Sequence, residues 1–184
     1  MEKVWSKLVV CFDRLTSKTY DDSAAEQYTY DKNGNLLRVT PPGNDPVDHV
    51  YDALNRLTDK EFVNSSSLDV AYTYDTGGRM LTANTTASNL TYVYNALNRV
   101  TSTTQRINST NYTIAYDSDL AGNRTQVTYP SNKVIDYTYD DKNYITEIEV
   151  DNTSLVEYTY DPLGRRTQKD LKGTVTQRAS YTYR

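Results

Sequence analysis

Residues 28–34 read Tyr-Thr-Tyr-Asp-Lys-Asn-Gly, and the first four of these residues return along most of the chain. The same tetrapeptide stands at 72–75, 137–140 and 158–161, and weaker copies stand at 50–52, 92–95 and 115–117. Counted from the acidic position, or from the asparagine that replaces it in the fourth copy, successive copies are 20 to 23 residues apart. A fixed period of this length indicates a repeat protein in which each copy is one structural unit.

Each copy predicts two short strands joined by a tight turn. Tyr28 and Tyr30 are two residues apart and therefore point to one face of a strand, whereas Thr29 points to the other. Aspartate opens the turn, where its carboxylate can accept the N–H two residues on, and glycine or asparagine closes it at a positive φ. The return strand alternates in the same way, as in Glu147-Ile148-Glu149-Val150. The sequence therefore predicts an all-β fold of consecutive antiparallel β-hairpins, one for each repeat of about 21 residues.

The repeated positions are interpreted as a structural motif, made of the second tyrosine, the acidic residue and, where present, the closing glycine. In chain order they are Tyr30, Asp31, Gly34, Tyr51, Asp52, Tyr74, Asp75, Gly78, Tyr94, Asn95, Tyr116, Asp117, Gly122, Tyr139, Asp140, Tyr160, Asp161 and Gly164. The fifth copy carries two extra residues, so its turn begins either at Asp117 or, in better register, at Asp119.

The repeats define the expected domain organisation. Residues 12–184 form one array of seven clear copies, and Tyr181-Thr182-Tyr183 supplies the first strand of an eighth copy that is cut short. Residues 1–11 are a non-repeat or degenerate segment. The 18 tyrosines provide large amphipathic rings for an ordered, tyrosine-rich packing.

Charge and cysteine content narrow the classes of function. The net charge is −4 and the lysines and arginines are scattered, so neither nucleic acid nor an anionic membrane surface is indicated as a partner. The longest apolar run near the start, residues 8–12, is too short for a signal peptide or a membrane span. Cys11 is the only cysteine, which excludes a disulfide within the chain.

The chain offers few groups for catalysis or metal binding. His49 is the only histidine, so no histidine-based triad or metal cluster can form, and it is expected to replace the first tyrosine of its copy. Among the repeated acids, only Asp117/Asp119 and Asp140/Asp141 offer pairs, fewer ligands than a calcium site needs. A glycosidase pair is left as a weaker alternative, because repeats bring carboxylates close together across strands. We predict no catalytic, cofactor or metal site.

The motif Tyr-Thr-Tyr-Asp-x-x-Gly-Arg-Leu at this spacing resembles the YD repeat of Rhs proteins, which also occurs in Tc toxin shells, bacterial wall-associated proteins and teneurins. The resemblance runs from Phe12 to Arg184 and implies a curved, spiralling ribbon of hairpins that forms part of a hollow shell around an effector. It also implies a secreted or cell-surface location. Compared with these proteins, the 184 residues are expected to be too few to close such a shell and to comprise neither an effector domain nor the C-terminal self-cleavage region. Asp161-Pro162-Leu163-Gly164 is followed by Arg165 instead of the leucine of the cleavage motif, and is therefore expected to be an ordinary turn.

Two functions follow from this interpretation. The first is a non-enzymatic shell segment whose partners are other YD repeats, of the same or a longer polypeptide, and an enclosed effector. The alternative is a surface adhesin whose ladder of tyrosine and arginine side chains binds a glycan or a cell-surface protein. Within the fold, a propeller with two repeats per blade is a further alternative, although seven repeats would close it poorly.

Overall fold

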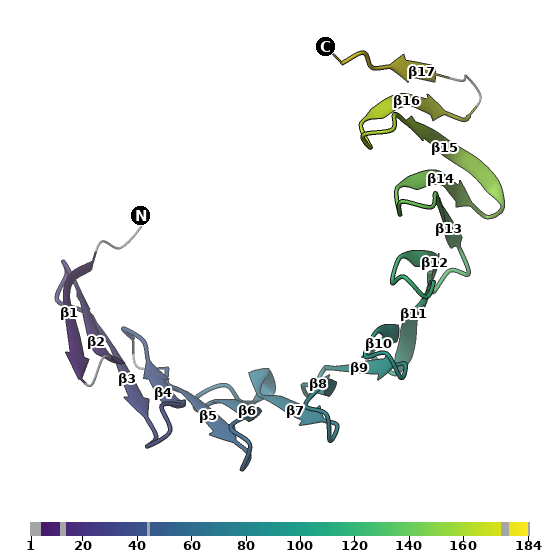
Figure 1. Ribbon diagram of the computed structural model, residues 1–184. Coiled ribbons are helices and arrows are strands. Elements are labelled where there is room, and N and C mark those ends of the chain that lie inside the picture. Colours follow the sequence, from purple (N-terminus) through teal and green to yellow (C-terminus); the bar gives the residue numbers. More distant parts are fainter. Residues whose placement is uncertain (1–4, 12–13, 44, 174–176, 184) are drawn as a thin grey trace. The chain divides into compact units, whose positions relative to one another are not determined.

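The computed structural model describes residues 5–11, 14–43, 45–173 and 177–183. The chain divides into two compact units, each described separately below. Unit 1 comprises residues 1–91 and 105–110, and unit 2 comprises residues 92–104 and 111–184. Both are built from antiparallel β-hairpins, which confirms the predicted all-β class (Figure 1).

Unit 1 contains eight whole strands in sequence order. They are β1 (Trp5–Cys11), β2 (Arg14–Tyr20), β3 (Ala25–Tyr30), β4 (Leu36–Thr40), β5 (Val47–Tyr51), β6 (Leu57–Phe62), β7 (Val70–Tyr74) and β8 (Met80–Asn84). Each pairs with the next. A single 3₁₀ turn, η1 (Ser66–Leu68), lies between β6 and β7.

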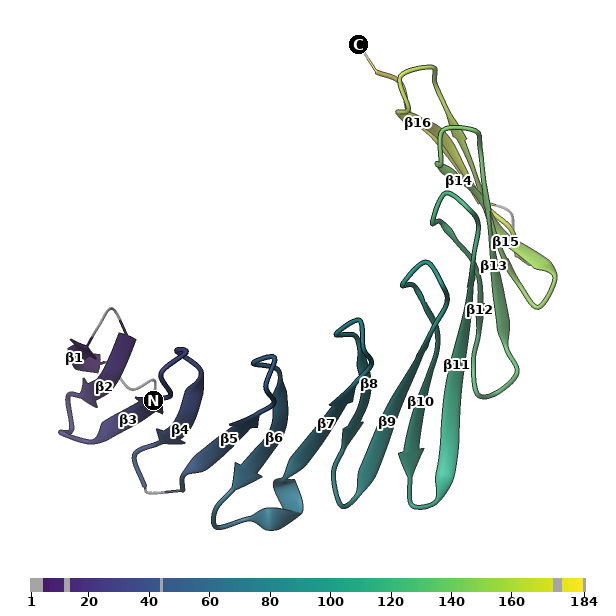
Figure 2. The same ribbon diagram turned by 60° about the horizontal axis from the view of Figure 1, so that its bottom comes forward.

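Three strands contain residues of both units, namely β9 (Ser88–Tyr94), β10 (Val100–Ile107) and β11 (Thr110–Ser118). The remaining strands of unit 2 are β12 (Arg124–Thr128), β13 (Val134–Tyr139), β14 (Ile145–Val150), β15 (Thr153–Tyr160), β16 (Arg166–Leu171) and β17 (Gln177–Ser180). From β11 to β17, each strand again pairs antiparallel with the next. Within each unit the strands lie side by side, with turns alternating between two edges (Figure 2).

The predicted eighth copy differs in its boundaries. The strand β17 covers Gln177–Ser180, and residues 181–183 lie outside any strand. Tyr181 still donates its N–H to the carbonyl of Thr167 in β16, at 2.9 Å. The pairing register is therefore continued by a single backbone bond, too few to form a strand ladder.

Neither unit has a conventional core. Among the described residues, only Val127, Val156 and Asp170 are buried. The strand residues on the tyrosine side are mostly half-buried, as shown by the alternating exposure of Val70–Tyr74 and Ser88–Tyr94. A single layer of strands is therefore stabilised mainly by contacts between neighbouring hairpins, as in other repeat proteins whose units contact only their neighbours.

Candidate functional site

The repeated aspartate closes each tight turn with its backbone and its side chain. In the second copy, Asp52 donates its N–H to the carbonyl of Arg56 at 2.9 Å and accepts the N–H of Asn55 at 3.0 Å. Its Oδ1 also accepts the N–H groups of Leu54 and Arg56, at 2.9 and 3.0 Å. The side chain therefore holds the turn as predicted for a turn-opening aspartate.

The same pair of backbone bonds closes the seven repeat turns, and the turns that begin at Tyr20 and Tyr129 share it. The repeat turns begin at Asp31, Asp52, Asp75, Asn95, Asp119, Asp140 and Asp161. The closing residue has a positive φ in each, which glycine and asparagine adopt most readily: Gly34, Asn55, Gly78, Asn98, Gly122, Asn143 and Gly164.

In the fifth copy the turn begins at Asp119, the second of the two alternatives. Asp117 lies in β11 opposite Gln126 of β12. Its place in the repeated motif is therefore a strand position, because the two extra residues lengthen the strand before the turn.

The side chain of the residue four places after the aspartate bonds the carboxylate of that aspartate, within the same turn. The Nε of Arg56 donates to Oδ2 of Asp52 at 2.7 Å, and the Nε of Arg79 donates to Oδ2 of Asp75 at 2.5 Å. Arg165 bonds Asp161 in the same way, whereas Asn35 and Asn123 use their amide groups. The backbone N–H bonds from Arg56 and Arg79, followed by their guanidinium bonds, hold the pKa values of Asp52 and Asp75 below the ordinary range.

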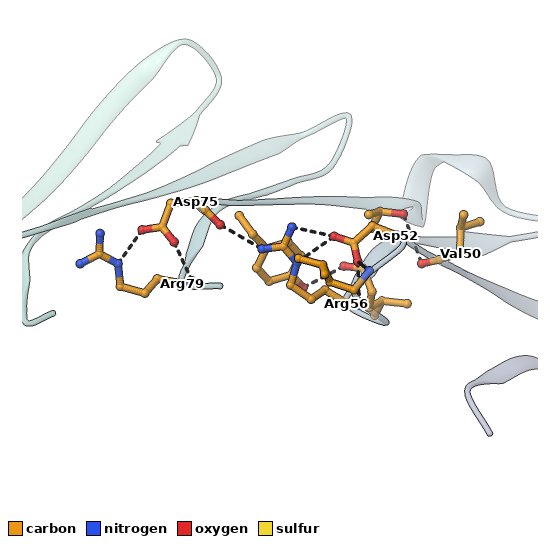
Figure 3. Close-up of polar contacts among 9 residues, drawn as sticks. Val50, Asp52, Arg56, Asp75 and Arg79 are labelled. Carbon is orange, nitrogen blue, oxygen red and sulfur yellow. Dashed lines mark hydrogen bonds and ion pairs between the residues drawn. The ribbon is translucent and has the colours of Figure 1, made fainter. Parts of the chain in front are cut away.

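The same arginine also reaches the next turn (Figure 3). The Nη1 of Arg56 donates to the backbone carbonyl of Asp75 at 2.9 Å, and its guanidinium lies 4.8 Å from the ring centre of Tyr74. Equivalent bonds run from Arg14 to Asp31 and from Arg99 to Asp119. Each arginine therefore links consecutive repeats along the turn edge. We name this set of links the turn ladder.

The copy at Asp140 has neither arginine nor asparagine at this position and replaces the contacts that they make. Tyr144 occupies the position four places after Asp140, and its ring stacks on that of Tyr160 with the centres 5.0 Å apart. The bond to the next turn comes instead from Lys142, whose Nζ donates to the carbonyl of Pro162 at 2.8 Å. The turn ladder therefore continues with a different donor.

In five copies the second tyrosine also bonds the preceding repeat. Its hydroxyl donates to a carbonyl at the start of the preceding return strand, over 2.8 to 3.0 Å: Tyr30 to Leu15, Tyr51 to Leu36, Tyr74 to Leu57, Tyr139 to Arg124 and Tyr160 to Ile145. Burial raises the pKa of each of these hydroxyls for which a shift is found, namely Tyr51, Tyr74, Tyr139 and Tyr160. Tyr116 differs, since its hydroxyl lies 3.3 Å from Oγ1 of Thr103.

The opposite face of the strands carries threonines. Thr73 and Thr82 pair their hydroxyls at 2.7 Å, and Thr159 and Thr167 do so at 2.8 Å. Both of these hydrogen bonds lie on the solvent-exposed side of the strands. The two faces therefore differ in chemistry, as the alternation of tyrosine and threonine predicted.

His49 and Cys11 are the other residues considered as catalytic or metal-binding groups. His49 lies in β5 opposite Lys60, two residues before Tyr51, which is the tyrosine position expected for it. Its pKa is lowered, first by partial burial and then by Lys60. The side chain of Cys11 and all of Phe12 and Asp13 lie outside the described residues. Within the described ranges, His, Cys, Asp and Glu side chains form no group of three that could hold a metal ion.

Asp161 was a candidate for self-cleavage because Pro162 follows it. Its Oδ1 accepts the N–H groups of Leu163 and Arg165, both at 2.9 Å, and its Oδ2 accepts the guanidinium of Arg165. These are the bonds that Asp52 makes. The surroundings of Asp161 are therefore those of an ordinary repeat turn.

No helix in the described residues has the length and hydropathy of a membrane span.

Comparisons with known proteins agree with this architecture. Residues 30–61 match the model of the RHS repeat. No curated protein sequence gives a significant match. One similar structure is a crystal structure of TcdB2-TccC3-Cdc42, with 16% identity, a TM-score of 0.54 and 92% of this chain covered.

A second similar structure is a Photorhabdus luminescens Tc holotoxin pore with a mutation in TccC3, with 17% identity, a TM-score of 0.55 and 95% of this chain covered. The chain spans only 13% of the length of each of these two proteins. At this identity the likeness shows a shared fold. Residues 30–61 thus match the RHS repeat, which agrees with the resemblance carried by the tyrosine–aspartate motif.

Proposed function

We propose that the chain is a non-enzymatic structural segment of an RHS-type shell that encloses or displays another polypeptide. One observation carries this proposal. The carboxylates of the repeats bond within their own turns, whereas guanidinium groups such as that of Arg56 and tyrosine hydroxyls such as that of Tyr74 also join one repeat to the next.

The hydrogen bonds that these groups make within the protein support a structural role. A carboxylate that acts in catalysis must be able to exchange a proton near the working pH. Asp52 and Asp75 instead accept several hydrogen bonds that keep them ionised. Seven equivalent turns also lack the unequal pair of carboxylates that glycoside hydrolysis uses.

The partners of such a segment are further RHS repeats, continued by strand pairing, and an enclosed effector. The similar structures are Tc toxin assemblies: one consists of TcdB2, TccC3 and Cdc42, and the other is a holotoxin pore that contains TccC3. By analogy we place this chain in a secreted or cell-surface shell, where its hairpins contribute a curved wall. This analogy is at the level of the fold.

Protease protection tests the proposal. The complete open reading frame that contains this chain is expressed, and any polypeptide encoded beyond the repeats is followed by mass spectrometry during digestion. We expect that polypeptide to be digested much more slowly than the same polypeptide expressed alone. Equal rates of digestion would contradict enclosure, and a hydrolytic activity of the repeats alone would contradict the non-enzymatic role.

The alternative function is an adhesin that binds glycans through its tyrosine and arginine ladder. Screening a glycan array with the Tyr74→Ala and Tyr139→Ala variants separates the two. If the variants stay folded but lose binding, the adhesin is favoured. Because both hydroxyls bond the preceding repeat, we expect loss of stability instead.

A further inference from the structure

A polar pocket lies at the edge of unit 1 that is opposite the turn ladder. The loop between β8 and β9 and the turn between β10 and β11 form it together. Its volume is about 270 Å³, and its lining consists of Thr86, Ala87, Asn89, Arg106, Asn108 and Ser109. Pockets for drug-sized ligands measure about 300 to 1,000 Å³, so this one suits a smaller molecule, of the size of one sugar ring.

Local hydrogen bonds fix the walls of this pocket. The hydroxyl oxygen of Thr85 accepts the N–H groups of Ala87 and Ser88, at 3.3 and 3.0 Å, and orders the first loop. Thr86 donates its hydroxyl to the carbonyl of Ser67 at 3.0 Å. Gln105 then joins the second hairpin to the first through Oγ of Ser88, at 3.4 Å. The backbone of the first loop is therefore ordered, whereas the side chains that line the pocket are exposed to solvent.

The second wall is a two-residue turn. Asn108 and Ser109 have φ values of 47° and 68°, as a tight hairpin turn requires. Within the described part of the chain, neither side chain makes a hydrogen bond, and neither does that of Asn89. Two amide groups and one hydroxyl are therefore available to a ligand.

Arg106 gives the pocket a positive charge. Arg106 makes no ion pair or hydrogen bond with any described residue, in contrast to Arg56 and Arg99, which hold the turn ladder. The segment 76–116, which supplies both loops, contains three arginines and neither aspartate nor glutamate. An otherwise acidic chain thus presents an unpaired guanidinium beside neutral amides, where an anion meets no repelling carboxylate from the same segment.

The geometry points to a binding site for an acidic sugar. Its carboxylate pairs with the guanidinium of Arg106, which offers two parallel donors to such a group. Its ring hydroxyls bond the amides of Asn89 and Asn108 and the hydroxyl of Ser109, which can donate or accept, and they donate to the hydroxyl oxygen of Thr86, whose proton is held by Ser67. This site lies apart from the tyrosine ladder, and it is independent of the proposed shell function.

Titration of the complete 184-residue chain tests the site. Sodium glucuronate, glucose and sodium sulfate are added separately, and backbone amide shifts are followed by NMR. We expect glucuronate to move the signals of residues 86–89 and 106–109 and to bind at least about tenfold more tightly than glucose, because glucose cannot form the ion pair. Equal binding of glucose, equal binding of sulfate, or shifts confined to other residues would each overturn the assignment.

Three variants complete the test. Arg106→Gln should weaken glucuronate binding at least about tenfold. Lys32→Gln removes one positive charge from an exposed turn elsewhere in unit 1 and should leave binding unchanged. Asn108→Gly removes an amide yet keeps the positive φ that glycine adopts freely, so it should weaken binding without unfolding the hairpin. Unchanged binding by Arg106→Gln, with far-UV circular dichroism like that of the parent chain, contradicts the proposal.

Discussion

The hydroxyl of Tyr74 donates a hydrogen bond of 2.8 Å to the backbone carbonyl of Leu57, across the boundary between two repeats. Tyr72 lies two residues earlier, in the same strand and on the same face, and no hydrogen bond of its hydroxyl is found within the described residues. Comparing variants at these two positions therefore separates the contribution of the hydroxyl hydrogen bond to stability from that of the aromatic ring.

Tyr74→Phe should destabilise the chain because it removes this bond and leaves a carbonyl without its partner. The expected loss is about 1 to 2 kcal/mol in the free energy of unfolding. Urea unfolding followed by circular dichroism measures it. Tyr72→Phe is the matched control and should change stability by less than about 0.5 kcal/mol. Equal losses in the two variants would show that the hydroxyl bond contributes nothing.

Arg56→Lys tests the turn ladder. Lysine keeps the positive charge but cannot bond Asp52 and the carbonyl of Asp75 together, since it lacks the planar fork of the guanidinium. We expect a loss of about 1 kcal/mol in unfolding free energy. Arg106→Lys, at an arginine with no such bonds, serves as the control and should be neutral. If Arg56→Lys leaves the unfolding free energy unchanged, the turn ladder does not contribute to stability.

Comparing Gly164→Ala with Gly78→Ala separates the cost of backbone strain from the cost of steric overlap. Both glycines have a positive φ, of 79° and 85°, so each alanine costs about 1 kcal/mol of backbone strain. A methyl group at Gly164 would also overlap the hydroxyl of Tyr144, whereas one at Gly78 meets nothing within 4 Å. Gly164→Ala should therefore be the less stable variant in urea, with NMR shifts at Tyr144 and Tyr160. Equal stability of the two variants would contradict the observed packing.

Through Asp75, the stability of the folded chain should depend on pH. The bonds from the N–H and then the guanidinium of Arg79 lower its pKa from the ordinary 3.8. A carboxylate with a lowered pKa stabilises the folded chain fully above its unfolded pKa, and this contribution is lost as the pH falls through the folded value. The urea midpoint should therefore decrease as the pH is lowered below about 4.

Asp75→Asn provides the control, because Asn95 already accepts the N–H groups of Leu97 and Arg99 without a charge. The variant should be less stable than the parent chain at pH 6 and should lose less stability between pH 6 and pH 3. An unchanged pH dependence would exclude Asp75 as its source. Other turns, such as that of Asp52, contribute the same effect and should keep part of the slope in the variant.

The sequence predicts the unit of this fold well, because turn chemistry and strand alternation are local. Aspartate, positive-φ glycine or asparagine, and tyrosines two apart require only neighbouring residues to be interpreted. The double role of Arg56 was missed, although an arginine or asparagine four places after the aspartate recurs in most copies. Its second bond depends on the register between hairpins, which the spacing alone does not define.

The pocket beside Arg106 could not be predicted in the same way. It depends on two loops that are about twenty residues apart and that meet only when their hairpins pair. The absence of acids from residues 76–116 was visible in the sequence and was the available signal. A composition averaged over the whole chain conceals it, since the net charge is −4.

The exceptional tyrosine, Tyr116, bears on the order in which the chain folds. Each hairpin closes through contacts between near neighbours in sequence, so it can form early, while a nascent chain is still being extended. Hairpins whose tyrosine bonds a carbonyl then dock firmly on the one before. Tyr116 reaches only a threonine hydroxyl at 3.3 Å. The two-residue turn at Asn108 and Ser109 therefore takes over part of what the tyrosine bond does at other boundaries, and hydrogen exchange in β11 measures how readily this boundary opens.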